Sequence, residues 1–133
     1  MGRLYHLSFN EITMKSVVIC GSRRFKPEIF EFAQKLRDLG VVVFAPHLHK
    51  AEDHEEWAKL SDDYKRFTAL GLTHDHFYKI KMADVVFVFN KGGYAGCSTT
   101  LEIGYAVALG KPLYALSHDD ELCRDVFIQR NNY

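Results

Sequence analysis

The sequence predicts an α/β fold, a Rossmann-like or flavodoxin-like three-layer sandwich around a parallel sheet of four or five strands. Residues 16–20 (SVVIC) and 85–89 (VVFVF) form short apolar runs without polar alternation, which is typical of strands buried on both faces. Residues 27–39 follow the first run with apolar side chains at helical spacing, so strand and helix alternate. Because such crossovers are right-handed, few other connections remain.

Length and composition indicate one globular domain. The 133 residues are too few for two cores, so we expect residues 16–133 to form a single domain after an N-terminal extension, 1–15, of uncertain structure. Seventeen basic and seventeen acidic residues cancel, so no overall basic field attracts a nucleic acid polymer. Three irregularly spaced cysteines favour a reducing cytoplasm over a disulfide framework, and no apolar run reaches membrane-spanning length. We therefore expect a soluble, cytoplasmic protein.

Turn and capping residues divide the rest of the chain. Residues 41–44 and 113–116 are predicted strands. The polar segment 52–70 is interpreted as one helix or two short ones, a candidate lid, ended by Gly71. Three further helices are predicted: one capped by Thr73 and running through Ala83, one capped by Ser98 and closed by Gly110, and one opened by Asp119, Asp120 and Glu121, with Leu122, Val126 and Ile128 facing inward.

A glycine-rich loop joins the strand at 85–89 to the helix after Ser98. Gly92, Gly93 and Gly96 indicate a tight backbone path. The helix start that follows offers free backbone N–H groups and the positive end of the helix dipole, which suit an anionic ligand such as phosphate. This strand, loop and helix form part of a βαβ unit, whose strand ends bind ligands in open α/β sheets.

Gly21, Ser22 and Arg23 form a corresponding loop after the first strand. The forked donors of an arginine beside a strand end suit a phosphate, and a solvated basic turn is the alternative interpretation.

Glu102 is an acidic residue in the first turn predicted for the helix after Ser98. An acid there often only compensates the helix dipole. However, Glu102 lies between Leu101 and Ile103 on a helix with almost no other polar residue, and it follows a glycine loop. It is therefore also a candidate for chemistry.

The segment E-I-G-Y-A-V-A-L-G-K-P, residues 102–112, resembles the signature of the nucleoside 2-deoxyribosyltransferase superfamily, which includes the deoxynucleoside monophosphate N-glycosidases. The resemblance extends over most of the chain from Ser16 onward. It is closest to small members of unassigned function with H-x-x-K-I-x-M-x-D, G-G-Y-x-G-x-S-T and E-I. The matching residues are His76, Lys79, Ile80, Met82, Asp84, Gly92, Gly93, Tyr94, Gly96, Ser98, Thr99, Glu102 and Ile103.

The resemblance implies that Glu102 attacks the anomeric carbon of a sugar and displaces the base. It implies a small nucleoside or nucleotide as partner, and no cofactor. An ionised Glu102, kept so by the helix N-terminus, would work with a nearby acid such as His76. The residues expected to bind substrate are Gly21, Ser22, Arg23, Gly92, Gly93, Tyr94, Gly96, Ser98 and Thr99.

His76 departs from the superfamily pattern. The characterised enzymes typically have an aspartate at this position, whereas here Asp75 lies one residue away on another helix face. His76 shares a face with Ile80 and Ala83, so it is either a core histidine or part of the site. Two functions therefore remain, an enzyme of N-glycosidic bonds and a nucleotide-binding or sensing module without turnover.

Two further expectations concern metals and assembly. The pairs His47/His49 and His74/His76 raise a metal site as a third, least favoured hypothesis, so we expect no bound metal. A homodimer or larger homo-oligomer is expected from three aromatic residues predicted to lie on the surface, Tyr94, Tyr105 and Phe127.

Overall fold

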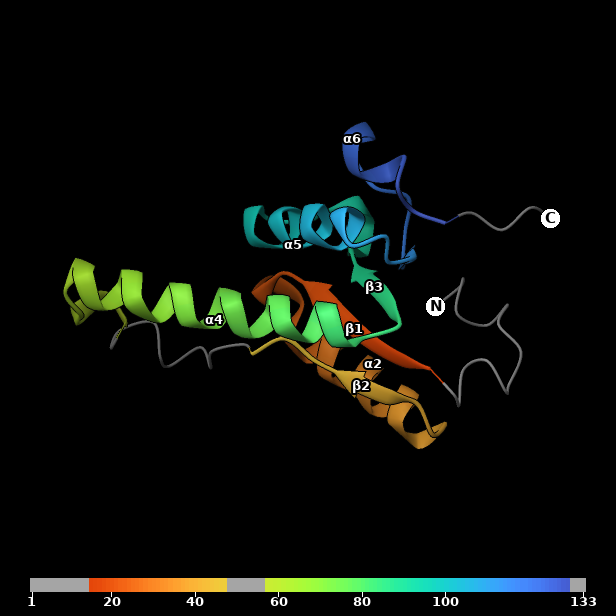
Figure 1. Cartoon of the computed structure of the whole chain (residues 1–133), viewed down its shortest axis with the longest axis horizontal. Coiled ribbons are helices and arrows are strands. Elements are labelled where there is room, and N and C mark those ends of the chain that lie inside the picture. The colour runs from red at the N-terminus through yellow and green to blue at the C-terminus, as the bar shows by residue number, and fades with distance from the viewer. Residues whose placement is uncertain (1–14, 48–56, 130–133) are drawn as a thin grey trace.

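The computed structural model describes residues 15–47 and 57–129, and within these residues four parallel strands lie in the order β2-β1-β3-β4 (Figure 1). This confirms the predicted α/β fold. The predicted extension, apart from Lys15, lies outside the described residues. The strands are β1 (Ser16–Gly21), β2 (Val42–Phe44), β3 (Val85–Phe89) and β4 (Leu113–Ala115); the helices are α2 (Lys26–Asp38), α4 (Asp62–Met82), α5 (Cys97–Ala108) and α6 (Leu122–Asp125).

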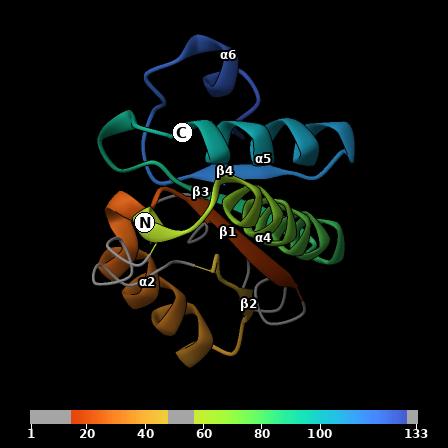
Figure 2. The same ribbon diagram turned by 90° about the vertical axis from the view of Figure 1, so that its left-hand side faces the viewer.

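Helices cover both faces of the sheet, as Figure 2 shows for α2 and α4. Because successive side chains of a strand point to opposite faces, Ile19 of β1 packs against α2, in one core with Phe32 and Phe87. Its neighbour Cys20 points to the other face and lies in a second core, between the sheet and the helices α4 and α5, together with Ile80 of α4. The alternation along β1 therefore decides which residues face α4 and α5.

Strand β1 has a neighbouring strand on each of its two sides. β1 pairs with β2 on one side and with β3 on the other, and both pairings are parallel. The carboxyl ends of β1 and β3 therefore flank the point where the strand order reverses, which is where open α/β sheets bind ligands. The loops that follow these two strands touch, because Arg24 lies over the ring of Tyr94, 3.8 Å from its centroid. The two loops thus lie side by side.

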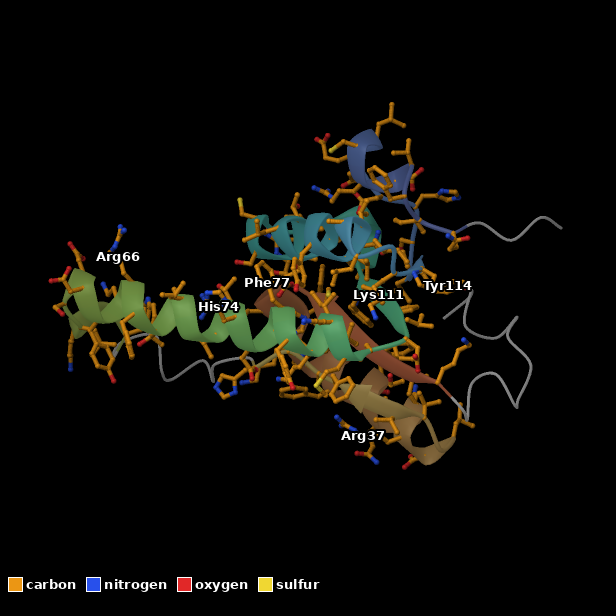
Figure 3. All side chains as sticks on the ribbon, viewed as in Figure 1. Arg37, Arg66, His74, Phe77, Lys111 and Tyr114 are labelled. Carbon is orange, nitrogen blue, oxygen red and sulfur yellow. The ribbon has the colours of Figure 1, made fainter. Side chains whose placement is uncertain are left out.

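Helix α4 is longer than predicted. It runs without a break through Gly71, and its N-cap is Ser61, whose hydroxyl accepts a hydrogen bond from the Tyr64 amide. Thr73 is no cap, since its hydroxyl donates to the Ala69 carbonyl within the helix. A single glycine costs a helix only about 1 kcal/mol relative to alanine, which does not break it. The first half of α4 extends beyond the sheet, where Figure 3 labels Arg66.

Helix α5 begins earlier than predicted. Its N-cap is Gly96, so Ser98 is the second residue of the helix, and Glu102 lies in the second turn instead of the first. Gly110 has a φ of 72° after the helix end, which confirms the predicted glycine closure.

The C-terminal segment packs through a polar face. Leu122 and Val126 are 75% and 62% exposed, so the prediction that they face inward is wrong. The reason is that Arg124 is drawn inward by an ion pair of 2.7 Å with the buried carboxylate of Asp119. Ile128 is buried, as predicted, and lies beside Leu113.

The surface differs in part from expectation. Tyr94 and Tyr105 are half-buried. Tyr105 of α5 stacks on Phe77 of α4 at 4.5 Å between ring centroids, and Figure 3 labels Phe77. Phe127 is exposed, as is Phe67 on the protruding half of α4. The homo-oligomer stays a prediction. None of the helices in the described residues is long and apolar enough to cross a membrane.

Gly71 and Gly110 provide a matched test of the backbone. At both positions an added Cβ would meet no atom within 4 Å, but only Gly110 has a positive φ. We expect Gly71→Ala to stabilise the protein by up to about 1 kcal/mol, and Gly110→Ala to destabilise it by about 1–2 kcal/mol. Chemical denaturation measures both effects. A destabilising Gly71→Ala would mean that α4 is interrupted there.

Candidate active site

A cavity of about 390 Å³ opens at the carboxyl ends of β1 and β2. Its volume is in the usual range for small-molecule sites. Glu102 and His76 both line it, as do the loop after β1 and the start of α5. The lining residues are Gly21, Ser22, Arg23, Pro46, His47, Trp57, Ala69, Leu72, Thr73, His76, Gly96, Cys97, Ser98, Thr99 and Glu102.

The loop after β1 is held in place by packing and a cap. A Cβ on Gly21 would lie 2.7 Å from Ile29 of α2, so this position has no room for a side chain. The Ser22 hydroxyl accepts a hydrogen bond from the Arg24 amide and caps the turn that follows. The Arg23 guanidinium is exposed beside the cavity, and it has no hydrogen-bond or ion-pair partner among the described residues. It is therefore available to an anionic ligand.

The start of α5 forms the opposite wall. Gly96 has no side chain to cap the helix, and the amides of the first turn have no acceptors within the helix. Cys97, Ser98 and Thr99 place this turn at the cavity. A helix N-terminus of this kind favours an anion.

Three of the predicted binding residues do not line this cavity. Gly92 and Gly93 have φ values of 67° and 89° and form the tight turn after β3. A Cβ on Gly93 would clash with the side chain of Asp120, so this glycine allows the 118–120 segment to approach. Tyr94 packs between Phe25 and Arg24. These residues shape the two loops and join them.

Three ionisable side chains from three elements meet at the cavity wall, two of them lining it and one lying behind. Cys20 comes from β1, His76 from α4 and Glu102 from α5. The Cys20 Sγ atom lies 3.4 Å from His76 Nε2, and this nitrogen lies 3.5 Å from Glu102 Oε2. Cys20 is fully buried, His76 is 5% exposed, and the Glu102 side chain is 13% exposed.

Burial keeps all three groups in their neutral forms. It raises the pKa of Glu102 from 4.5 to about 8, which contradicts the expectation that the helix N-terminus keeps this carboxylate ionised. Glu102 lies in the second turn, behind the amides that would stabilise its charge. Burial and the nearby Lys79 charge lower the pKa of His76 to about 4, against smaller opposite effects of Asp75 and the Ile19 backbone. Burial also raises the pKa of the Cys20 thiol, and Glu102 raises it further.

The second ring nitrogen of His76, Nδ1, lacks a hydrogen-bond partner among the described residues. The Nδ1 atom is buried and makes no hydrogen bond of ordinary geometry with any described residue. The Ile19 backbone therefore has only a weak effect on the pKa of His76. Such orphan atoms are rare in protein interiors and cost stability. The predicted core interpretation of His76 is therefore incomplete, because the imidazole is both buried and directed at Glu102.

Cys20 is the functional candidate that sequence reasoning missed. The sequence indicates only that Cys20 belongs to a buried strand, although its parity along β1 places it on the face of α4 and α5. The donor atoms of Cys20, His76 and Glu102 lie within 4.8 Å of one another, and among the described residues this group could hold a metal ion. His49 lies outside the described residues, and the exposed His74 is not part of this group.

The sequence matches the model of the nucleoside 2-deoxyribosyltransferase family over residues 19–133. The chain belongs to this family. The matched range includes the cavity-lining loops, α4 and Glu102. At the level of the family, this supports nucleoside glycosyl transfer and small nucleoside substrates. No curated protein matches the chain in sequence.

Two solved structures share the fold. The 2-deoxyribosyltransferase from the psychrotolerant bacterium Bacillus psychrosaccharolyticus has a TM-score of 0.58 and 21% identity, over 85% of this chain and 82% of its own. A 2-desoxiribosyltransferase from Leishmania mexicana has a TM-score of 0.50 and 23% identity, over 79% of this chain. The match spans 65% of the Leishmania chain, just under two thirds. At these identities the likeness concerns the fold.

The raised pKa of Glu102 predicts a stability effect with a definite sign. Between about pH 4.5 and 8 the folded protein holds a proton on Glu102 that the unfolded chain releases, so stability falls as the pH rises through this window. We expect Glu102→Gln to be more stable than the wild type at pH 8, by an amount on the order of a few kcal/mol, and similar to it at pH 4.5.

Urea denaturation in buffer with a chelator, at both pH values, measures the difference. Glu31→Gln is the matched control, since Glu31 is exposed on α2 and its loss should matter little at either pH. Equal stability of Glu102→Gln and wild type at pH 8 would contradict the predicted burial penalty.

Proposed function

We propose that this family member acts on the N-glycosidic bond of a nucleoside or nucleotide, with Glu102 as the nucleophile. The position of Glu102 carries the proposal. It lines the cavity between the loop after β1 and the start of α5, with His76 as its neighbour. A sugar bound there would have its phosphate or hydroxyl groups near Arg23 and the helix N-terminus, and its anomeric carbon near Glu102.

The reaction proceeds in two steps. The Glu102 carboxylate forms a bond to the anomeric carbon while the C–N bond breaks, and the base leaves with the electron pair and gains a proton. Water or the nitrogen of a second base then attacks the glycosyl ester, and Glu102 is released as carboxylate. The first acceptor gives hydrolysis and the second gives base transfer.

His76 acts as a positioning residue in this scheme. Its pKa of about 4 leaves the imidazole neutral at pH 7, and a neutral imidazole is too weak an acid to protonate a leaving base. Its Nε2 atom, 3.5 Å from Glu102, instead holds the carboxyl group toward the cavity. The expected role of His76 as an acid is therefore not part of the proposal. The base takes its proton from solvent or from a group outside the described residues.

A binding or sensing module without turnover is the second candidate. The pKa of Glu102, about 8, favours it, because only about a tenth of this carboxylate is ionised at pH 7. In this case the cavity binds the nucleotide and Glu102 donates a hydrogen bond to the sugar. The two candidates differ only in whether the glycosidic bond is broken.

Replacement of Glu102 separates them. We expect wild type to release free base from at least one common nucleoside, deoxynucleoside or monophosphate, and Glu102→Gln to release none while it keeps its affinity for the nucleotide. The amide keeps the shape of the side chain but cannot form the ester. Chromatography measures free base, with and without a second base as acceptor, and calorimetry measures binding.

Glu31→Gln, on the far side of the sheet, controls for the loss of one negative charge. Saturable binding with no base released by the wild type from any substrate would support the sensing module. Equal turnover by wild type and Glu102→Gln would exclude Glu102 as nucleophile.

Adjacent arginines test where a phosphate binds. Arg23 lines the cavity, whereas Arg24 lies over Tyr94 and does not line it. We expect Arg23→Ala to weaken binding of a nucleoside monophosphate about 10-fold, as expected for one charge-assisted hydrogen bond, and to leave nucleoside affinity unchanged. Arg24→Ala should change neither affinity by this amount. Calorimetry with both ligands decides, and equal losses from both variants would place the phosphate elsewhere.

A further inference from the structure

We propose that Cys20, His76 and Glu102 form a binding site for Zn²⁺, with a fourth coordination position directed at the nucleotide cavity. Each residue comes from a different element of the fold, and each offers one donor atom to a common point. Zinc sites with three protein ligands and one further position, built from cysteine, histidine and carboxylate donors, are the usual form of a reactive zinc centre.

The distances between the donor atoms fit this geometry. Zinc bonds to sulfur, nitrogen and oxygen are about 2.0–2.3 Å long, so tetrahedral ligand atoms lie roughly 3.3–3.7 Å apart. The separations of Cys20 Sγ from His76 Nε2, 3.4 Å, and of that nitrogen from Glu102 Oε2, 3.5 Å, meet this requirement. The three donor atoms all lie within 4.8 Å of one another. The last torsion of a glutamate is broad, so the carboxylate can turn to complete the triangle.

The electrostatic surroundings of the three side chains favour the binding of a cation between them. The buried Cys20 thiol lies near the Glu102 carboxyl group, whose side chain is 13% exposed, and a charge on Glu102 disfavours ionisation of the thiol. The Lys79 ammonium does not compensate them, because it pairs with Asp75 and donates to the Ala45 carbonyl. A divalent ion among the three donors would compensate a thiolate and a carboxylate at once.

The donor set selects the metal. A thiolate and an imidazole suit Zn²⁺, whereas Mg²⁺ and Ca²⁺ require oxygen ligands. The donors sit on a strand and two packed helices, so their geometry is largely fixed before the ion binds. The ion can enter from the cavity, which His76 and Glu102 line while Cys20 closes the site from behind.

Metal binding and base release then exclude each other, a consequence that rests on the proposed function. Coordination of Zn²⁺ displaces the thiol proton of Cys20 and the carboxyl proton of Glu102 to solvent, and no electrons are transferred. A carboxylate bound to zinc cannot attack an anomeric carbon. Zn²⁺ would therefore act as an inhibitor that competes for the nucleophile.

Direct metal binding tests the site without any need for turnover. Metal-free wild type should bind one Zn²⁺ with a Kd tighter than about 1 μM, measured by competition with a chromogenic chelator. Co²⁺ at the same site should give the thiolate charge-transfer band and the strong visible bands of a tetrahedral centre. Mg²⁺ should not compete.

Matched cysteine variants locate the site. Cys20→Ala should abolish the Co²⁺ charge-transfer band and weaken Zn²⁺ binding at least ~10-fold, since even changes outside the ligand shell cost this much. Cys123→Ser, an exposed cysteine on α6, should retain both properties. Should Cys20→Ala fail to fold by circular dichroism, His76→Asn provides the same comparison for affinity.

Zn²⁺ binding by wild type that is no tighter than that of Cys20→Ala, or that His76→Asn leaves intact, would overturn the proposal. So would loss of binding in Cys123→Ser alone. Base release is read separately, in metal-free protein and after addition of Zn²⁺. Zinc binding without base release from metal-free protein would count against the proposed function alone, whereas base release without zinc binding would count against the metal site alone.

Discussion

The parallel pairing of β1 with β3 is the constraint on which the rest of the structure depends. It places Gly21 opposite Phe89 in register, so the loops after the two strands emerge together at one edge of the sheet. The same pairing fixes the face toward which each residue of β1 points. A slip of one residue would turn Cys20 toward α2 and Ile19 toward α4. The cavity and the group behind it therefore both depend on this register.

The sequence was sufficient for those parts of the fold that are determined locally. The run VVFVF corresponds to β3 without correction, because five consecutive β-branched or aromatic residues bounded by turn residues favour a strand. The prediction that Gly71 ends a helix was wrong, because one glycine lowers helix stability without ending the helix. The prediction that Ser98 caps α5 was wrong. Serine is a good cap in general, but here the N-cap is Gly96. Local preference is weak where both alternatives are compatible with the same fold.

The chemistry of the site was less accessible to sequence reasoning. The sequence indicates Glu102 and His76 as site residues, but their charge states depend on burial, which comes from residues far away along the chain. Cys20 is 56 positions from His76, and only the assembled sheet brings them to 3.4 Å. Pairs at such separation leave no periodic signal in one sequence. The parity of Cys20 along its strand was the one available indication. The burial of Glu102 and His76 lowers the stability of the fold, as is common at functional sites.

Helix α4 links the width of the cavity to the geometry at Glu102. Its 21 residues form a rod of roughly 32 Å. The residues near its middle, Ala69, Leu72 and Thr73, form a wall of the cavity, and His76 follows one turn later. An α-helix is stiff over one turn, so this wall and the imidazole move together. A tilt of α4 that widened the cavity would also change the distance between His76 and Glu102. The width of the cavity and the alignment of the Glu102 carboxyl group are thus coupled through one helix.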